Sequence, residues 1–253
     1  MMVSIVLPVY NEFLLLPMVI DRIMKAPLPA GCDREIIIVN DGSTDGTTEL
    51  LAQYEAYPLV LVHHSPVNFG KGAAIRIGLT KARGDYILIQ DGDLEYDPRD
   101  YAALLAPLLA AEAAVVYGSR FLRGVAGMRK RNWIANKILT LAANFLFRAR
   151  ITDEATAYKA FRRSALESLK LRCIRFEFCP EVTAKVRRLG YSIREVPISY
   201  NPRGVLEGKK IRWQDGVEAL YTLFRYRFAP LQSFAVPPHR DEDPRSRTAQ
   251  AGK

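Results

Sequence analysis

Two aspartates, Asp91 and Asp93, follow an apolar run over residues 86–90 and flank a single glycine. Mg²⁺ and Mn²⁺ favour oxygen ligands, and Mg²⁺ is usually held by one or two carboxylates together with substrate phosphates. The glycine permits close approach of a backbone or a ligand. The motif therefore indicates a divalent metal that binds a diphosphate. The alternative is an acidic turn, because Asp-Gly pairs are also common in hairpins.

Two more polar segments follow apolar runs in the same way. Residues 8–12 read Pro-Val-Tyr-Asn-Glu at the end of one run, and residues 40–43 read Asn-Asp-Gly-Ser after another. In a parallel sheet the ligand crevice lies beyond the carboxyl ends of the strands. Three polar sets at equivalent strand ends are therefore expected to converge on one site.

The elements that must position these motifs are short strands that alternate with helices. The apolar runs are continuous, as is typical of strands buried on both faces of a parallel sheet. Their alternation with helical patterns predicts βαβ units with right-handed crossovers. We expect strands at 3–9, 35–39, 59–62, 86–90 and 114–117, and helices near 12–25, 46–56, 71–83 and 98–111.

The second half has a different pattern. Residues 133–148 and 213–228 each predict a helix with one apolar stripe, and residues 193–198 predict a strand. Core packing is the default interpretation of both stripes. A helix on a membrane surface is the alternative, because lysines and arginines flank both segments. The chain after residue 237 is polar and predicts a disordered tail over 237–253.

The 253 residues carry a formal net charge of +9, which favours anionic partners such as phosphates, nucleic acid or a membrane surface. Three cysteines without a Cys-x-x-Cys pair, and no export signal, predict a cytoplasmic protein. No apolar run reaches the roughly 18 to 20 residues that span a bilayer. Much of the basic charge lies between residues 113 and 152, which contain no acid and eight basic residues: Arg120, Arg123, Arg129, Lys130, Arg131, Lys137, Arg148 and Arg150.

The three polar motifs, in this order and at this spacing, resemble those of family 2 glycosyltransferases. Residues 118–120 (Gly-Ser-Arg) and 197–200 (Pro-Ile-Ser-Tyr), with Arg203, make the chain similar to the dolichol-phosphate mannose synthase branch, which moves a sugar onto a polyprenyl phosphate. The resemblance covers roughly residues 2 to 228. It implies an α/β GT-A nucleotide-sugar-binding fold, a mostly parallel twisted sheet flanked by helices, with C-terminal amphipathic helices.

The resemblance also implies an organisation of the chain and a pair of substrates. We expect one domain over residues 1–230, with a nucleotide-binding half (1–120) and an acceptor-binding half (121–230). The expected donor is GDP-mannose or a UDP-hexose, and the expected acceptor is a polyprenyl or dolichyl phosphate. The expected location is peripheral, on an anionic cytoplasmic membrane face. Oligomeric state is open.

Roles carry over from the family to matching positions. Asp91 and Asp93 would bind Mg²⁺ or Mn²⁺ and, through it, the donor diphosphate, with Glu95 as a possible third ligand. Asn40 departs from the aspartate of many relatives and leaves the nucleotide base open. The nucleotide pocket would also include Pro8, Tyr10, Glu12, Asp41 and Lys71, with Lys71 near donor phosphate, while Arg120, Arg131 and Arg203 would contact phosphate groups during catalysis beside Asp93.

Three other functions compete with this interpretation. A family 2 enzyme acting on a soluble or surface glycan hydroxyl would need a general base, and the sequence identifies none. A nucleotidyltransferase would normally carry a glycine-rich, lysine-bearing loop after the first strand, where residues 8–12 stand instead. A nucleic-acid-binding protein would fit the charge but leaves residues 91–93 unexplained, so we expect no nucleic-acid partner.

Overall fold

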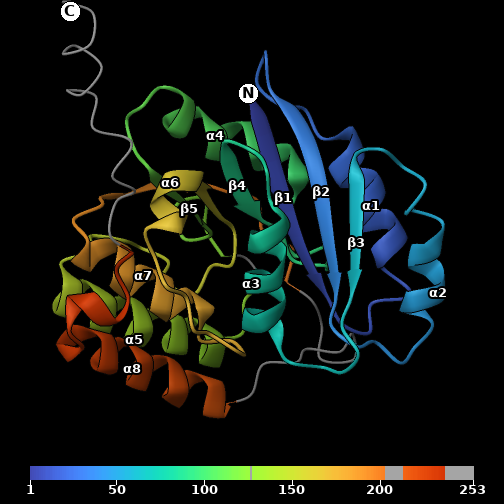
Figure 1. Cartoon of the computed structure of the whole chain (residues 1–253). Helices are drawn as coiled ribbons and strands as arrows, with labels where there is room; N and C mark the ends of the chain where they lie inside the picture. The colour runs from blue at the N-terminus through green and yellow to red at the C-terminus, as the bar shows by residue number, and fades with distance from the viewer. Residues whose placement is uncertain (126, 203–212, 237–253) are drawn as a thin grey trace, which may run out of the picture.

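A seven-stranded, mostly parallel sheet forms the centre of the protein in a computed structural model that describes residues 1–125, 127–202 and 213–236 (Figure 1). The strand order is β3-β2-β1-β4-β6-β5-β7. The strands are β1 (Met2–Val9), β2 (Asp33–Asn40), β3 (Val60–His64), β4 (Tyr86–Ile89), β5 (Val115–Ser119), β6 (Lys159–Arg162) and β7 (Ile193–Pro197).

Helices flank this sheet, which confirms the expected α/β architecture. The predicted helices are present but mostly begin later or end earlier than the sequence indicates. They are α1 (Leu16–Lys25), α2 (Thr47–Ala52), α3 (Lys71–Lys81), α4 (Tyr101–Leu109), α5 (Lys130–Phe147), α6 (Arg163–Glu167), α7 (Phe178–Arg188) and α8 (Trp213–Phe228), with 3₁₀ turns η1 (Pro98–Asp100) and η3 (Leu231–Ser233).

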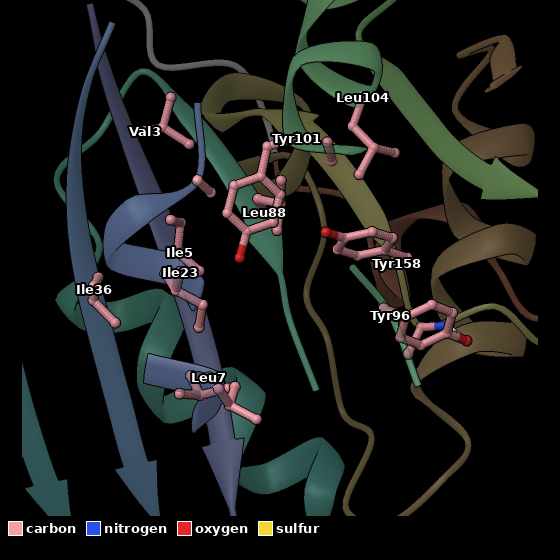
Figure 2. Close-up of a cluster of buried hydrophobic side chains, with 14 of the residues drawn as sticks. Val3, Ile5, Leu7, Ile23, Ile36, Leu88, Tyr96, Tyr101, Leu104 and Tyr158 are labelled. Carbon is pink, nitrogen blue, oxygen red and sulfur yellow. Dashed lines mark hydrogen bonds between the residues drawn. The ribbon is translucent and has the colours of Figure 1, made fainter. Parts of the chain in front are cut away.

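Alternate residues of the buried strands feed two apolar cores. On β1, Val3, Ile5 and Leu7 pack with α1 and α4, as Figure 2 shows in part. Val6 faces the opposite core, which contains Ala74 of α3 and residues of α5, α7 and α8. Both faces of the central strands are therefore buried, which explains why their sequences are continuously apolar.

Strand β6 and helices α6 and α7 are elements that the sequence analysis missed. β6 is antiparallel to both β4 and β5, so it reverses direction inside the sheet. It has four residues and begins with Lys159, whose side chain is nonetheless fully buried. On α7, Glu181 and Lys185 are buried as an ion pair. Buried charged residues interrupt the apolar pattern of a sequence, so the elements that contain them are not predicted from that pattern.

The default expectation that the stripes of 133–148 and 213–228 pack into the core is wrong. On α5 the side chains of Leu141 and Phe145 are 70% and 83% exposed, and on α8 Phe228 is 77% exposed. The reason is that each helix also has a second, narrower set of buried residues. α5 buries Leu139, Thr140, Ala143 and Phe147, and α8 buries Asp215, Ala219, Thr222, Leu223 and Tyr226.

Candidate active site

The three polar motifs meet at the carboxyl ends of β1, β2 and β4. The parallel register pairs Val9 with Asn40, the last residues of β1 and β2. The backbone N–H of Gln90 donates to the carbonyl of Val6 at 3.0 Å, so the chain after β4 leaves the sheet beside β1. The predicted convergence of strand ends is confirmed.

Hydrogen bonds join the first two motifs directly. The backbone N–H of Asn11 donates to the Ser43 hydroxyl at 2.9 Å, and the Asn11 side-chain oxygen accepts from the N–H of Thr44 at 2.8 Å. The N–H of Glu12 donates to the Thr47 hydroxyl at 3.2 Å. These bonds fix the segment that contains Pro8, Tyr10 and Glu12 against the loop after β2. Their contact with a nucleoside remains a prediction.

Gly92 brings the third motif against the first. A Cβ atom at this position would lie 3.3 Å from the carbonyl oxygen of Pro8 and 3.7 Å from Cγ of Glu12. The first distance is tighter than most Cβ contacts, so a larger residue would displace the neighbouring backbone. A glycine between the two aspartates thus permits close approach, as its place in the motif predicts.

Asp41 is almost fully buried and holds the turn before α3. Its Oδ1 accepts from the N–H of Phe69 at 2.9 Å, and its Oδ2 accepts from the N–H of Gly70 at 2.7 Å. Both oxygens of this carboxylate therefore fix backbone. These bonds show that Asp41 stabilises the turn before α3. A contact between Asp41 and the nucleoside remains a prediction.

Lys71, the first residue of α3, forms an ion pair with Asp91. Its Nζ lies 2.5 Å from Oδ1 of Asp91, and the two side chains are 23% and 15% exposed. Burial acts to lower the pKa of Lys71, but the charge of Asp91 outweighs it and the pKa is raised. The loop after β3 and the acidic motif after β4 are therefore joined by charge.

The aspartate pair fits a hard divalent cation that also binds phosphate. Asp93 is 9% exposed and its Oδ1 accepts from the N–H of Glu95 at 2.9 Å. The Lys71 ammonium shows that a cation is favourable against Asp91. In the described ranges no three His, Cys, Asp or Glu side chains form a metal-binding group, so Glu95 as a third ligand remains a prediction. Two carboxylates plus a substrate diphosphate suit Mg²⁺ or Mn²⁺.

Arg120 is buried and pairs with an acid that the sequence analysis did not single out. Its Nε and one terminal nitrogen each lie 2.7 Å from an oxygen of Asp153, and its guanidinium lies over the Tyr200 ring at 5.2 Å. Burial opposes its charge, but Tyr96 and Asp153 hold the pKa of Arg120 well above its usual value. A phosphate contact for Arg120 remains a prediction.

The same neighbourhood leads to α5, in the half of the chain predicted to bind the acceptor. Tyr96 pairs with Tyr200 in a β-bridge, and the N–H of Asn201 donates to the carbonyl of Glu95 at 2.9 Å. A terminal nitrogen of Arg120 lies 3.5 Å from the side-chain oxygen of Asn136 on α5. The acidic motif is thus connected to the N-terminal half of α5 through a short series of contacts.

Arg131 is exposed at the start of α5. Nearby is a pocket of about 380 Å³ with a mainly apolar lining of Met128, Lys130, Trp133 and Ile134. Arg131 is therefore accessible to a phosphate, whereas Arg120 is buried. Arg203, the third predicted arginine, lies outside the described residues, as does the predicted tail 237–253.

A second buried acid, Glu154, was also missed. Neither of its side-chain oxygens has a hydrogen-bond partner among the described residues. Burial, opposed by Lys159, raises the pKa of Glu154 to about 7. The Lys159 ammonium donates to the carbonyls of Glu154 and Thr156 and lies 3.7 Å from the centre of the Tyr117 ring. One signal was available, because Asp153 and Glu154 are the first acids after the acid-free stretch 113–152.

The profile of the family described as "Glycosyl transferase family 2" matches residues 4–170. The chain is 30% identical to dolichyl-phosphate beta-glucosyltransferase ALG5D of Trichomonas vaginalis, over 88% of this chain and 72% of that protein. It is 29% identical to ALG5A of the same organism, over 83% and 68%. It is 27% identical to glycosyltransferase AglD of Haloferax volcanii, over 80% and 33%. The protein belongs to glycosyltransferase family 2 and is a glycosyltransferase.

Solved structures support the same fold. The chain is similar to glucosyl-3-phosphoglycerate synthase of Mycobacterium tuberculosis, solved with Mn²⁺, uridine diphosphate and phosphoglyceric acid. The TM-score is 0.68 at 23% identity, over 90% of this chain and 79% of that one. The expected GT-A-like architecture is confirmed.

Proposed function

We propose that this glycosyltransferase moves a hexose from a nucleotide sugar to a polyprenyl phosphate at a membrane surface, with a divalent metal. The observation that carries the proposal is a large apolar surface on α5 and α8. Helix α5 also carries Asn136, which contacts the buried Arg120, and the Arg120 guanidinium lies over the Tyr200 ring. The names of two relatives, dolichyl-phosphate beta-glucosyltransferases, support the lipid acceptor and favour glucose.

The apolar surface of α5 and α8 suits a lipid better than water. Helices α5 and α8 pack against each other (Figure 1). Isolated exposed apolar residues are common on proteins, but clusters of large ones mark interaction sites. The surface consists of side chains that are 42% to 83% exposed, namely Trp133, Ile134, Ile138, Leu141 and Phe145 on α5 and Trp213, Val217, Tyr221, Phe224 and Phe228 on α8.

Basic side chains accompany this surface. Arg129, Lys130 and Arg131 are exposed at the start of α5, and Arg225 and Arg227 are exposed near the end of α8. Near an anionic membrane each such residue contributes about 1 kcal/mol of attraction. No helix in the described part of the chain has the length and apolarity to cross a bilayer. The exposed basic residues beside the apolar surface support peripheral binding, for which we propose the cytoplasmic face.

The chemistry follows from charge. A lipid phosphate is an anion near neutral pH, so it attacks the anomeric carbon without a strong general base, in a single displacement with inversion. A bound Mg²⁺ or Mn²⁺ supplies positive charge against the departing nucleoside diphosphate. Asp91 and Asp93 would hold that cation, Lys71 would add positive charge at the diphosphate, and Arg131 would orient the acceptor phosphate by paired hydrogen bonds.

The test uses the purified full chain with radiolabelled UDP-glucose and GDP-mannose and with dolichyl or undecaprenyl phosphate in anionic vesicles. We expect a labelled glycolipid with one donor in Mn²⁺ or Mg²⁺, and salt-sensitive binding to the vesicles. If the protein ignores vesicles and lipid phosphates but glycosylates a soluble sugar, the hydroxyl-acceptor function replaces this one.

A further inference from the structure

We propose that Lys71 is a built-in counter-ion for the aspartate pair, and that the donor diphosphate withdraws it so that metal and nucleotide bind cooperatively. The inference deepens the proposed function and rests on its metal-dependent donor site. The starting observation is the 2.5 Å contact between Nζ of Lys71 and Oδ1 of Asp91, made by two side chains that are mostly shielded from water. Like charges repel strongly at such distances in a partly buried site. An ammonium in contact with Asp91 therefore opposes a divalent cation on the same carboxylate.

The backbone at the start of α3 is fixed, so only the side chain of Lys71 is free to change partner. Gly70, the residue before it, has φ +107°, and a Cβ at that position would lie 2.5 Å from the carbonyl oxygen of Ile174. Only glycine fits this turn. The N–H of Gly70 is bound by Asp41 at 2.7 Å. Asp41 and the close approach of Ile174 together set the point from which the lysine side chain extends.

Two backbone amides in the first turn of α3 already have backbone partners. The N–H of Gly72 donates to the carbonyl of Arg175 at 2.8 Å, and that of Ala73 donates to the carbonyl of Ile174 at 2.9 Å. Helix N-termini usually bind anions through such amides. Here the amides of Gly72 and Ala73 are already used, so the Lys71 side chain is the group of this turn that offers charge to a phosphate.

The segment that closes the helix end is itself held by a carboxylate. Glu177 accepts from the N–H of Ile174 at 2.5 Å and from the N–H of Arg175 at 2.9 Å. The carbonyls of this turn are thereby aimed at α3. The arrangement leaves the Lys71 side chain as the movable part of an otherwise fixed junction between α3 and the acidic motif.

Donor binding then changes the partner of Lys71. Once the ammonium contacts a phosphate oxygen, Asp91 is released for the metal, and the metal in turn binds the same diphosphate. Each ligand therefore raises the affinity of the other, and linkage requires the two effects to be equal. Without a nucleotide, Lys71 keeps metal affinity low.

The experiment measures Mn²⁺ affinity by titration, following free Mn²⁺ by electron paramagnetic resonance, with and without UDP or GDP. We expect the nucleotide to tighten Mn²⁺ binding of the wild type about fivefold or more. In Lys71→Met, Mn²⁺ alone should bind about threefold to tenfold more tightly than to the wild type, and the nucleotide should add less. If Lys71→Met fails to fold, Lys71→Gln replaces it in the same titration, with the same expected result.

The control is Lys25→Met, because Lys25 also pairs with an aspartate, Asp21, but at the exposed end of α1. It should leave both affinities unchanged. If Lys71→Met and Lys71→Gln bind Mn²⁺ alone no more tightly than the wild type, the counter-ion role is wrong. If the wild type binds no Mn²⁺ even with UDP or GDP, both this role and the metal requirement fail. A failure to glycosylate lipid while the Mn²⁺ effects hold would overturn only the proposed acceptor.

Discussion

The strands of residues 1–120, the half predicted to bind the donor nucleotide, and the helices of residues 121–230, the half predicted to bind the acceptor, use apolar residues in opposite ways. We call these two parts the donor half and the acceptor half. In the donor half, strands β1, β2 and β4 bury nearly all of their apolar side chains and place polar groups at their ends. In the acceptor half, α5 and α8 expose Phe145, Phe228 and other large side chains. Burying such a side chain stabilises by about 1.5 to 3 kcal/mol. The strands of the donor half therefore bury their apolar area within the fold, whereas α5 and α8 leave much of theirs exposed.

The charges differ in the same way. In the donor half Lys71 is paired with Asp91. In the acceptor half Arg131 is exposed, and no acid in the described ranges forms an ion pair with it. A paired and shielded charge suits a defined small ligand, whereas exposed positive charge suits an anionic surface and its phosphates. The comparison predicts separable defects in the two halves.

The largest effect is expected at the acidic motif. Asp91→Ala and Asp93→Ala should each lower transfer about 1,000-fold or more, because each would remove a proposed ligand of the cation that stabilises the leaving diphosphate. EDTA should do the same to the wild type. Asp21→Ala, on the exposed face of α1, is the control and should keep full activity. Initial rates and melting temperatures provide the measurement, and full wild-type activity in EDTA would exclude a metal.

Arg131→Ala should come next, with a loss confined to the acceptor. Losing a charged hydrogen-bond donor to phosphate costs about 1.5 to 3 kcal/mol, so turnover with lipid phosphate should fall about 10- to 100-fold. Nucleotide affinity by calorimetry should stay within twofold. Arg148→Ala, at the other end of the same helix, controls for net charge. Equal losses of donor and lipid binding would place Arg131 in the donor site instead.

A smaller effect is expected from the apolar surface. Phe145→Glu and Leu141→Glu should each weaken binding to anionic vesicles about tenfold, because a lipid contact is replaced by a charge of the wrong sign. Turnover of a short-chain, detergent-soluble lipid phosphate should change little. Leu59→Glu, an exposed apolar position before β3, is the matched control. Vesicle sedimentation measures the difference, and unchanged binding by both α5 variants would assign this surface to another partner.

The donor half could be predicted from the sequence because burial of its strands on both faces determines both the apolar pattern and the structure. Strands buried on both faces must be continuously apolar, so the runs 3–9 and 35–39 marked β1 and β2 closely. Polar residues directly after such runs then mark the strand ends. The convergence of Asp41 and Asp91 needed only this rule, although the bonds that Asp41 makes to backbone did not follow from it.

The acceptor half could be predicted less well, because periodicity shows that residues share a helix face but not what covers that face. The stripes of α5 and α8 look like core stripes for this reason. Partners distant in sequence, such as Arg120 and Asp153, leave no local pattern. Buried charges that are hydrogen-bonded inside the fold, such as Lys159 donating to two carbonyl oxygens, look like surface residues in a sequence.

The smallest effect on sugar transfer is expected from Glu154→Gln, whose main effect should be on the stability of the fold. The pKa of Glu154 is about 7 when folded and ordinarily about 4.5. Below pH 4.5 both states are protonated. Between pH 4.5 and 7 only the unfolded state loses the proton, so the free energy of unfolding falls as pH rises. The loss should total about 1 to 3 kcal/mol and then level off above pH 7.

Glutamine mimics the protonated acid, so Glu154→Gln should remove this part of the pH dependence and be more stable than the wild type at pH 8. Urea unfolding of both proteins at several pH values from 4.5 to 8 measures it. Glu167→Gln, an exposed acid on α6, is the control and should follow the wild-type curve. Parallel curves for wild type and Glu154→Gln would mean that Glu154 stays ionised in the fold, with Lys159 outweighing its burial.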